Sequence, residues 1–253
     1  MTASLRPTLG PTTVDPEDVA RFSAIAEQWW DENGKFRPLH RLNPVRLTYI
    51  RDVVCARLGR DAAAPQPLAG LRLADVGCGG GLLAEPLARM GAMVTGIDAS
   101  AKNIGTASVH AAQTGTAVDY RVSTAEDLAA SGEKFDIVTC LEVIEHVADV
   151  ELFVKSLGQL LAPGGVLFLA TLNRTPKSYL FAIIGAEYVL RWLPKGTHDW
   201  KKFIRPSELA ALLRAEGMAF GDLTGVTYEP FGGSFRLSPR DLDVNYMGWA
   251  EKR

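Results

Sequence analysis

Short runs of β-forming residues alternate with helical patterns from Leu71 onward, and this alternation restricts the possible folds more than any other property of the sequence. The runs expected to form strands are LRLADVG, AMVTGID, AVDYRVS, KFDIVTC, GGVLFLAT, AFGDLTGVTYEP, GSFRLS and VNYMGWAEK. Helical patterns fill three of the first four gaps, which predicts an α/β fold with a mostly parallel sheet and right-handed crossovers. The last three runs have no long helix between them, which predicts an antiparallel edge.

Four consecutive parts are predicted within a single domain of residues 1–253. They are a helical cap (15–60), a core that carries a glycine loop (70–172), an insertion or lid (173–205), and a C-terminal helix with antiparallel strands (206–253). Within the cap we expect an amphipathic helix over 15–30, with Asp15 as its N-cap, and a second helix over 43–58.

The composition indicates an ordinary soluble globular protein. Hydrophobic residues make up 47% and charged residues 22% of the 253 residues, and the net charge is −2. This balance lacks the basic excess that is typical of proteins that bind nucleic acid. The three cysteines are scattered, so they suggest neither a zinc site nor a disulfide framework. Because the N-terminus lacks the pattern of a signal peptide, we expect a cytoplasmic protein.

A glycine loop, LADVGCGGGLLAEPLA, follows the first predicted strand. Gly77 and Gly79 let the backbone turn sharply and let a ligand approach where a Cβ atom would clash. A dinucleotide fingerprint would require glycine or alanine where this chain has Leu82, and the lysine of a P-loop is absent. Asp75, at the end of the strand, suits a cationic or amine-bearing ligand better than a pyrophosphate.

Asp98 ends the second predicted strand, in GIDAS. A carboxylate at this position can accept hydrogen bonds from both hydroxyls of a ribose. The alternative is that Asp98, or Ser100 beside it, is simply the N-cap of the following helix. Because the glycine loop is also present, we favour the ligand interpretation.

Two carboxylates and an imidazole interrupt an apolar passage in CLEVIEHV, directly after a predicted strand. Glu142, Glu145 and His146 have the spacing i, i+3, i+4, so on a helix or tight turn they project to one side. They could hold a divalent ion, and magnesium best matches the carboxylate oxygens. His146 could instead act directly as a base, since imidazole titrates near neutral pH. A structural interpretation, in which the acids begin a helix, stays open at this point.

Together these stretches resemble the class I S-adenosylmethionine-dependent methyltransferases. The resemblance rests on DVGCGGG, GID, TAED and FDIVT, and it implies a Rossmann-like, mostly parallel seven-stranded sheet with helices on both faces. It also implies that S-adenosylmethionine is bound. The implied cofactor contacts are Asp75, Gly77 and Gly79 at the methionine part, Asp98 at the ribose, Ala125 and Glu126 near the adenine, and Leu141 just past the fourth strand.

Longer stretches narrow the resemblance to the ubiquinone biosynthesis O-methyltransferases. They span most of residues 18–247 and include WWDENGKFRPLHRLNPVRLTYI, LEVIEHV, TLNRTPKSYL, GAEYVLRWLPKGTHDWKKFIRPSEL and DVNYM. This resemblance implies O-methylation of a polyprenylated catechol and of demethylubiquinol. Other enzymes of quinone biosynthesis are then expected as possible partners.

The same resemblance implies roles for further residues. Arg46 would contact the cofactor from the cap, although the sequence alone would leave it as a surface arginine. Glu142, Glu145 and His146 would form a metal site, catalytic because the ion would hold both ring oxygens and lower the pKa of the phenol. Apart from the resemblance, His198 is a second candidate as a base or a substrate-pocket residue, but a loop histidine hydrogen-bonded to the backbone is the better interpretation there.

The insertion carries an apolar stretch over 178–193 with basic residues on both flanks. This pattern fits interfacial binding to anionic lipid, and thus a peripheral position on the inner face of the cell membrane. A lid helix packed on the catalytic pocket explains the pattern equally well. Three rival functions stay open: a nucleotide-dependent oxidoreductase, disfavoured by Leu82 and Asp75, a non-catalytic lipid-binding scaffold, and a methyltransferase of another small catechol.

Overall fold

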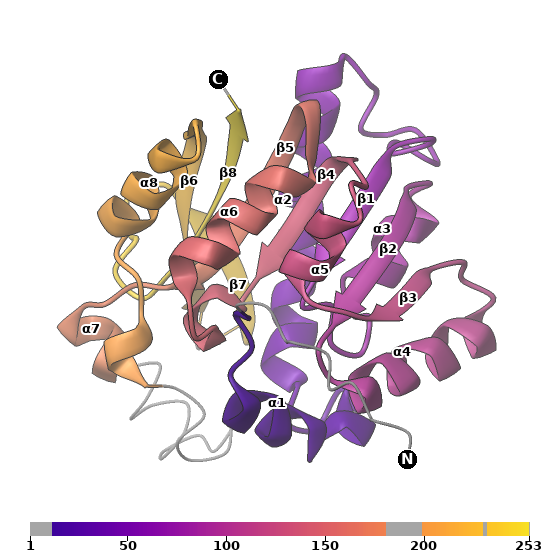
Figure 1. Ribbon diagram of the computed structural model, residues 1–253, viewed down its shortest axis with the longest axis horizontal. Helices are drawn as coiled ribbons and strands as arrows, with labels where there is room; N and C mark the ends of the chain where they lie inside the picture. The colour runs from indigo at the N-terminus through magenta and orange to yellow at the C-terminus, as the bar shows by residue number, and fades with distance from the viewer. Residues whose placement is uncertain (1–11, 181–198, 230–231, 253) are drawn as a thin grey trace, which may run out of the picture.

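The computed structural model describes residues 12–180, 199–229 and 232–252 (Figure 1). Most of the predicted insertion, including the apolar stretch from residue 181 onward and His198, lies outside the described residues. The predicted division of residues 1–253 into four parts stays a prediction.

The described chain alternates strands and helices in the expected order. The helices are α1 (Pro16–Ser23), η1 (Ala26–Gln28), α2 (Arg37–Leu58), α3 (Ala84–Arg89), α4 (Ala101–Thr114), α5 (Ala125–Ala130), η2 (Ile144–His146), α6 (Val150–Leu160), α7 (Pro176–Ser178), η4 (Trp200–Lys202) and α8 (Pro206–Ala215). The strands are β1 (Arg72–Val76), β2 (Met93–Asp98), β3 (Asp119–Val122), β4 (Phe135–Leu141), β5 (Leu161–Leu172), β6 (Met218–Glu229), β7 (Ser234–Ser238) and β8 (Asn245–Lys252).

All eight strands form one sheet in the order β3-β2-β1-β4-β5-β8-β6-β7. The five strands from β3 to β5 pair in parallel, and β8, β6 and β7 continue the sheet in antiparallel pairs. The predicted α/β architecture with an antiparallel C-terminal edge is therefore confirmed. It has eight strands rather than seven, because the run SFRLS pairs with β6 as a separate edge strand.

Helices cover both faces of the sheet (Figure 1). Successive residues of β5 point to opposite sides: Leu167 and Leu169 belong to a core cluster with α6 and α8, whereas Phe168 belongs to one with α2 and α3. The central strands thus read as continuous apolar runs because both of their faces are buried.

The two helices of the cap differ from their predicted boundaries. Asp15 is the N-cap, as expected, and its side chain accepts a hydrogen bond from the Glu17 amide. The first helix ends at Ser23, however, and the chain continues as the 3₁₀ turn η1. The second helix begins at Arg37 rather than at residue 43, because Pro38 occupies its first turn and Pro44 is accommodated inside it.

Candidate active site

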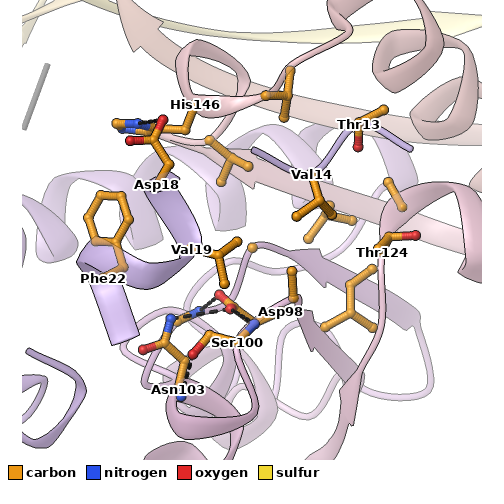
Figure 2. A pocket seen from close by; sticks show the side chains of 18 of the residues that line it. Thr13, Val14, Asp18, Val19, Phe22, Asp98, Ser100, Asn103, Thr124 and His146 are labelled. Carbon is orange, nitrogen blue, oxygen red and sulfur yellow. Dashed lines mark hydrogen bonds and ion pairs between the residues drawn. The ribbon is translucent and has the colours of Figure 1, made fainter. Parts of the chain in front are cut away.

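A cavity lies at the carboxyl ends of β1, β2 and β4, beside α1 (Figure 2). In an open α/β sheet this edge is where ligands bind. The predicted site residues that line the cavity are Gly77, Gly79, Asp98, Ala125, Glu142 and His146. The other predicted site residues, all of which are described, are not among its lining side chains: Arg46, Asp75, Glu126, Leu141 and Glu145.

Asp98 faces the cavity from the end of β2 (Figure 2). Its carboxylate accepts hydrogen bonds from the amides of Gly79 (3.0 Å) and Ser100 (2.8 Å) and from Asn103 Nδ2 (3.2 Å). The cap of α4 is Ser100, whose Oγ accepts from the Asn103 amide. Asp98 is therefore not needed as the helix cap, and its place in the cavity fits a ribose-binding carboxylate.

The glycine loop is closely covered by Trp29, a residue that the motif analysis did not single out. A Cβ atom placed on Gly79 or Gly80 would lie 2.3 Å from the indole of Trp29. The indole Nε1 donates to Asn103 Oδ1 (3.0 Å), and the ring lines the cavity. The approach of a ligand is thus one reason for glycine at position 79, and the Trp29 indole is a second reason, which applies to Gly80 as well. Leu82 is buried in the same small core as Trp29, which explains why a leucine follows the loop.

Asp75 lies behind the glycine loop and is 3% exposed. Its Oδ1 accepts a hydrogen bond from Thr139 Oγ1 (2.7 Å), since the two residues are paired across β1 and β4. No described group bonds its buried Oδ2. Burial raises the pKa of this carboxyl to about 6, while Thr139 and Arg46 act in the opposite direction. An unpartnered acidic oxygen at this place fits a ligand that brings an amine.

Ala125 and Glu126 begin α5, whose N-cap is Thr124. Ala125 lines the cavity. The Glu126 carboxylate instead accepts hydrogen bonds from Thr12 Oγ1 (2.9 Å), the Thr13 amide (2.7 Å) and Thr13 Oγ1 (2.9 Å). Glu126 thus holds the N-terminal segment in place. Thr13 and Glu126 are 113 positions apart in the sequence, so the motif around Glu126 could not indicate this contact.

Glu142 forms a polar cluster with Arg46 and Asn245. Arg46 Nη2 donates to Glu142 Oε1 at 2.8 Å, and Asn245 Nδ2 donates to the same oxygen at 3.1 Å. Arg46 is 6% exposed, so the interpretation as a surface arginine is wrong. Leu141, one residue earlier, packs against the core cluster that includes α2.

Glu145 and His146 point to different surroundings, although they are adjacent in η2. Glu145 is 3% exposed, and its Oε2 accepts from Thr171 Oγ1 (2.8 Å). Burial and the nearby Glu142 carboxylate raise the pKa of Glu145. His146 Nδ1 lies 3.4 Å from Asp18 Oδ2, and Phe22 packs edge-on against its ring (Figure 2).

The predicted metal trio does not converge on one point. Within the described residues, to which all three belong, no group of three or more His, Cys, Asp and Glu side chains could hold a metal ion. The spacing argument assumed one helical face, but Glu142 precedes the 3₁₀ turn η2 and has a φ of 58°. The trio as described does not fit a magnesium ion.

Asp18 is a site residue that sequence analysis missed. It is 6% exposed and lies near His146, Arg21 and Lys202. Burial tends to raise the pKa of Asp18, but its contacts with His146, Lys202 and Arg21 together lower it. In the sequence it appeared as one of several acids in the first turn of a helix, so no local signal distinguished it.

Comparisons with known proteins agree with this geometry. A family described as "Methyltransferase domain" matches residues 47–220. The ubiquinone biosynthesis O-methyltransferase of a Chelativorans species is 57% identical over 241 residues, which cover 95% of each chain. The enzyme of that name from Sinorhizobium fredii is 59% identical over 236 residues, 93% of this chain and 95% of that protein.

This chain belongs to the ubiquinone biosynthesis O-methyltransferases.

Among solved structures, magnesium protoporphyrin IX methyltransferase from Synechocystis with bound S-adenosylhomocysteine is similar to this methyltransferase, with a TM-score of 0.58 and 25% identity. The match covers 81% of this chain and 83% of that one. The methyltransferase described here is thus an enzyme that depends on S-adenosylmethionine. Among its described residues, no helix is long and apolar enough to cross a membrane.

Proposed function

We propose that this methyltransferase transfers the methyl group of S-adenosylmethionine to a ring hydroxyl of a polyprenylated catechol and of demethylubiquinol. This choice of acceptor rests on the family to which the chain belongs. The chemistry rests on one observation about the site: Gly77, Gly79 and Asp98 line the same cavity as Glu142 and His146. Cofactor and acceptor can therefore meet inside it.

S-adenosylmethionine fits the residues around the cavity. When bound, it supplies an electrophilic methyl group on a sulfonium. We propose that Asp98 holds its ribose hydroxyls, that Gly77 and Gly79 leave room for its methionine part, and that Asp75 Oδ2 accepts from its ammonium. Ala125 would lie at the adenine.

The acceptor hydroxyl must lose its proton, because a phenol with a pKa of about 10 is mostly protonated at neutral pH. We propose His146 as the general base. Asp18 lies next to its Nδ1, which favours the tautomer with a proton on Nδ1 and leaves proton transfer to Nε2. Methyl transfer then proceeds in line once the oxygen and the methyl carbon are held in contact.

Glu142 has a different proposed role from the one that its spacing indicated. Its carboxylate is fixed by Arg46 and Asn245, so it can orient an acceptor hydroxyl by accepting a hydrogen bond from it. Arg46 would then act on the site through Glu142. Glu145, deeply buried, supports η2 from behind through Thr171.

A turnover assay with a short-chain demethylubiquinol tests the proposal. We expect His146→Asn to lower kcat by about 100-fold or more, because general base catalysis contributes typically that much, while the Kd for S-adenosylmethionine stays within twofold. Glu133→Ala is a suitable control, since Glu133 pairs with Arg72 and Arg121 and does not line the cavity. A His146→Asn enzyme with undiminished turnover would remove the proposed base.

Acceptor specificity needs a separate measurement. A methyltransferase of another small catechol would turn over a catechol without a prenyl tail as efficiently as the prenylated one. We expect the kcat/KM of this chain to be higher for the prenylated acceptor, and equal values would favour the alternative.

Magnesium remains a prediction from the family resemblance, and no step above depends on it. Assays with chelator and with added magnesium test it directly. If turnover stays complete in chelator, the metal prediction fails. If chelator abolishes turnover and magnesium restores it, the side chains must rearrange from the positions described here.

We also propose that the insertion over 178–193 brings the enzyme to the membrane surface, where a polyprenyl tail resides. The support is the sequence pattern together with Tyr179 and Leu180, which are 48% and 52% exposed at the start of the stretch. Deleting residues 179–190 should abolish sedimentation with anionic liposomes. Unchanged binding would leave only a lid role, and pull-down with other enzymes of quinone biosynthesis would test those partners.

A further inference from the structure

Trp30 directly follows Trp29 in the sequence. It contacts the glycine loop but does not line the described cavity. Its indole Nε1 donates a hydrogen bond to the Gly80 carbonyl oxygen at 2.9 Å. Its ring stacks on the imidazole of His110 in α4, with centroids 3.4 Å apart and planes 7° from parallel. One indole therefore joins the loop to the helix that follows β2.

Behind this stack lies a carboxylate that the proposed chemistry does not use. His110 Nδ1 is 2.7 Å from Glu85 Oε1, and Glu85 is fully buried. Its other oxygen, Oε2, accepts from Thr114 Oγ1 (3.1 Å) and from Arg89 Nη1 (3.3 Å). Glu85 belongs to the first turn of α3, and its amide donates to the Gly81 carbonyl at 3.1 Å.

These contacts form a closed path that begins and ends on the glycine loop. It runs from the Gly80 carbonyl through Trp30, His110 and Glu85 to the Gly81 carbonyl. Burying a carboxylate is costly unless donors satisfy it, and an apolar side chain could link α3 and α4 without that cost. What the polar path adds is directionality, since hydrogen bonds fix the orientation of each group.

We propose that Trp30, oriented by His110 and Glu85, is a positioning residue for the cofactor. By fixing the Gly80 carbonyl it holds the glycine loop in the shape that binds S-adenosylmethionine. The N-terminal cap thereby becomes part of the cofactor site from outside the cavity. This inference concerns the cofactor and does not depend on which acceptor is methylated.

The test is Trp30→Phe in the full chain, which keeps an aromatic ring but removes the N–H donor. We expect the Kd for S-adenosylmethionine, measured by calorimetry without acceptor, to rise about three- to tenfold, as for the loss of one hydrogen bond. In the demethylubiquinol assay, KM for the cofactor should rise by the same factor, whereas kcat at saturating cofactor should stay within twofold.

Trp200→Phe is a matched control. Trp200 Nε1 also donates to a backbone carbonyl, that of Thr175, at 3.0 Å, but in η4. The Trp200→Phe variant should lower the thermal midpoint about as much as Trp30→Phe does, but it should leave the Kd for S-adenosylmethionine unchanged. If both variants weaken cofactor binding equally, the effect is general destabilisation, and the proposal fails.

His110→Phe decides the question if Trp30→Phe does not fold. It keeps a ring for the stack and removes the bond to Glu85, so cofactor binding should weaken in the same direction. In the double variant the loss should not exceed the larger single loss by more than about twofold, because both act through one path. Folded single variants with the wild-type Kd would overturn the inference. If the wild type binds cofactor but does not methylate the quinol, the proposed acceptor fails and this inference stands.

Discussion

At the scale of single residues, Glu142 combines an unusual backbone with a fixed side chain. It is the only non-glycine residue in the described chain with a φ in the left-handed region, at 58°. Such a conformation costs about 1–3 kcal/mol and persists where surrounding contacts over-determine it. Arg46 and Asn245 supply these contacts, which is consistent with a residue held in place for its carboxylate.

A pair of substitutions at this position separates the backbone from the carboxylate. Glu142→Gly and Glu142→Ala both leave the buried Arg46 without its ion pair, so both should lose several kcal/mol of unfolding free energy. We expect the glycine variant to be about 1 kcal/mol more stable than the alanine variant, because glycine tolerates a positive φ. Urea unfolding of both variants measures the difference. If the alanine variant is as stable as the glycine variant, the backbone at position 142 is not strained.

Asp75 makes stability depend on pH. Its pKa in the fold is about 6, above the ordinary value of 3.8, so the fold disfavours the charged form. The contribution of Asp75 to stability is therefore lost as pH rises from about 4 to about 6. Relative to wild type, Asp75→Asn should gain stability across this interval, by roughly 3 kcal/mol at most, and the gain should stay constant above it.

Thermal unfolding of Asp75→Asn and wild type at pH 4.5 and pH 7.5 checks this, with the exposed Asp52→Asn as control. The same variant should bind S-adenosylmethionine more weakly, since an amide is a poor partner for an ammonium group. A stability difference that does not change with pH would contradict the raised pKa.

At the scale of elements, the N-terminal segment and α1 border the cavity (Figure 2), and side chains from other elements hold them there. In one set of contacts, Glu126 binds Thr12 and Thr13. A second set binds Asp15, the N-cap of α1, through Lys202, whose Nζ lies 2.8 Å from Oδ2. The wall of the cavity that α1 provides thus depends on side chains from α5 and η4, far away in the sequence.

Removing one set should loosen this wall. Glu126→Ala deletes three hydrogen bonds, so local opening of residues 12–23 should become about tenfold or more frequent. Limited proteolysis without ligand should show faster cleavage within this segment. Glu133→Ala is the control, because Glu133 pairs with Arg121 and Arg72 and does not touch the segment. Equal cleavage rates for the two variants would show that Glu126 does not hold the wall.

At the scale of the whole molecule, the cap and the sheet share one core. Ile50 and Val54 of α2 lie in the same buried cluster as Leu73 of β1 and Phe168 of β5. Trp29 and Leu82 form a second link, between the cap and the glycine loop. The cap has no separate core of comparable size in the described chain, so it is expected to unfold together with the sheet.

We therefore expect one cooperative thermal transition, and we expect S-adenosylmethionine to raise its midpoint temperature. At a ligand concentration of 100 times Kd, binding adds about 2.7 kcal/mol, which corresponds to roughly 5–10 °C for a chain of this size. NAD should give no shift, because Leu82 and Asp75 do not suit a pyrophosphate. Two separate transitions, or a shift with NAD, would be the contrary result.

Local patterns predicted much of the fold correctly. The succession of strands along the chain, the antiparallel edge and the Asp15 cap follow from apolar periodicity and capping residues within a few positions of each other. The cap helices were predicted less accurately. The early start of α2 has a local signal, Pro38 in its first turn, whereas η1 accompanies packing of Trp29 and Phe36 that no local pattern reveals.

For the active site, the sequence by itself determined which strand ends carry polar residues: Asp75, Asp98 and the 142–146 stretch. This was possible because parallel strands bring their carboxyl ends to one edge. Only the tertiary structure decided what those residues contact. Arg46 meets Glu142 across 96 positions, and Asp18 meets His146 across 128. Such pairs depend on how the cap folds back over the sheet. The three residues of the predicted metal trio are therefore divided: Glu142 and Glu145 stay near each other, whereas His146 contacts Asp18.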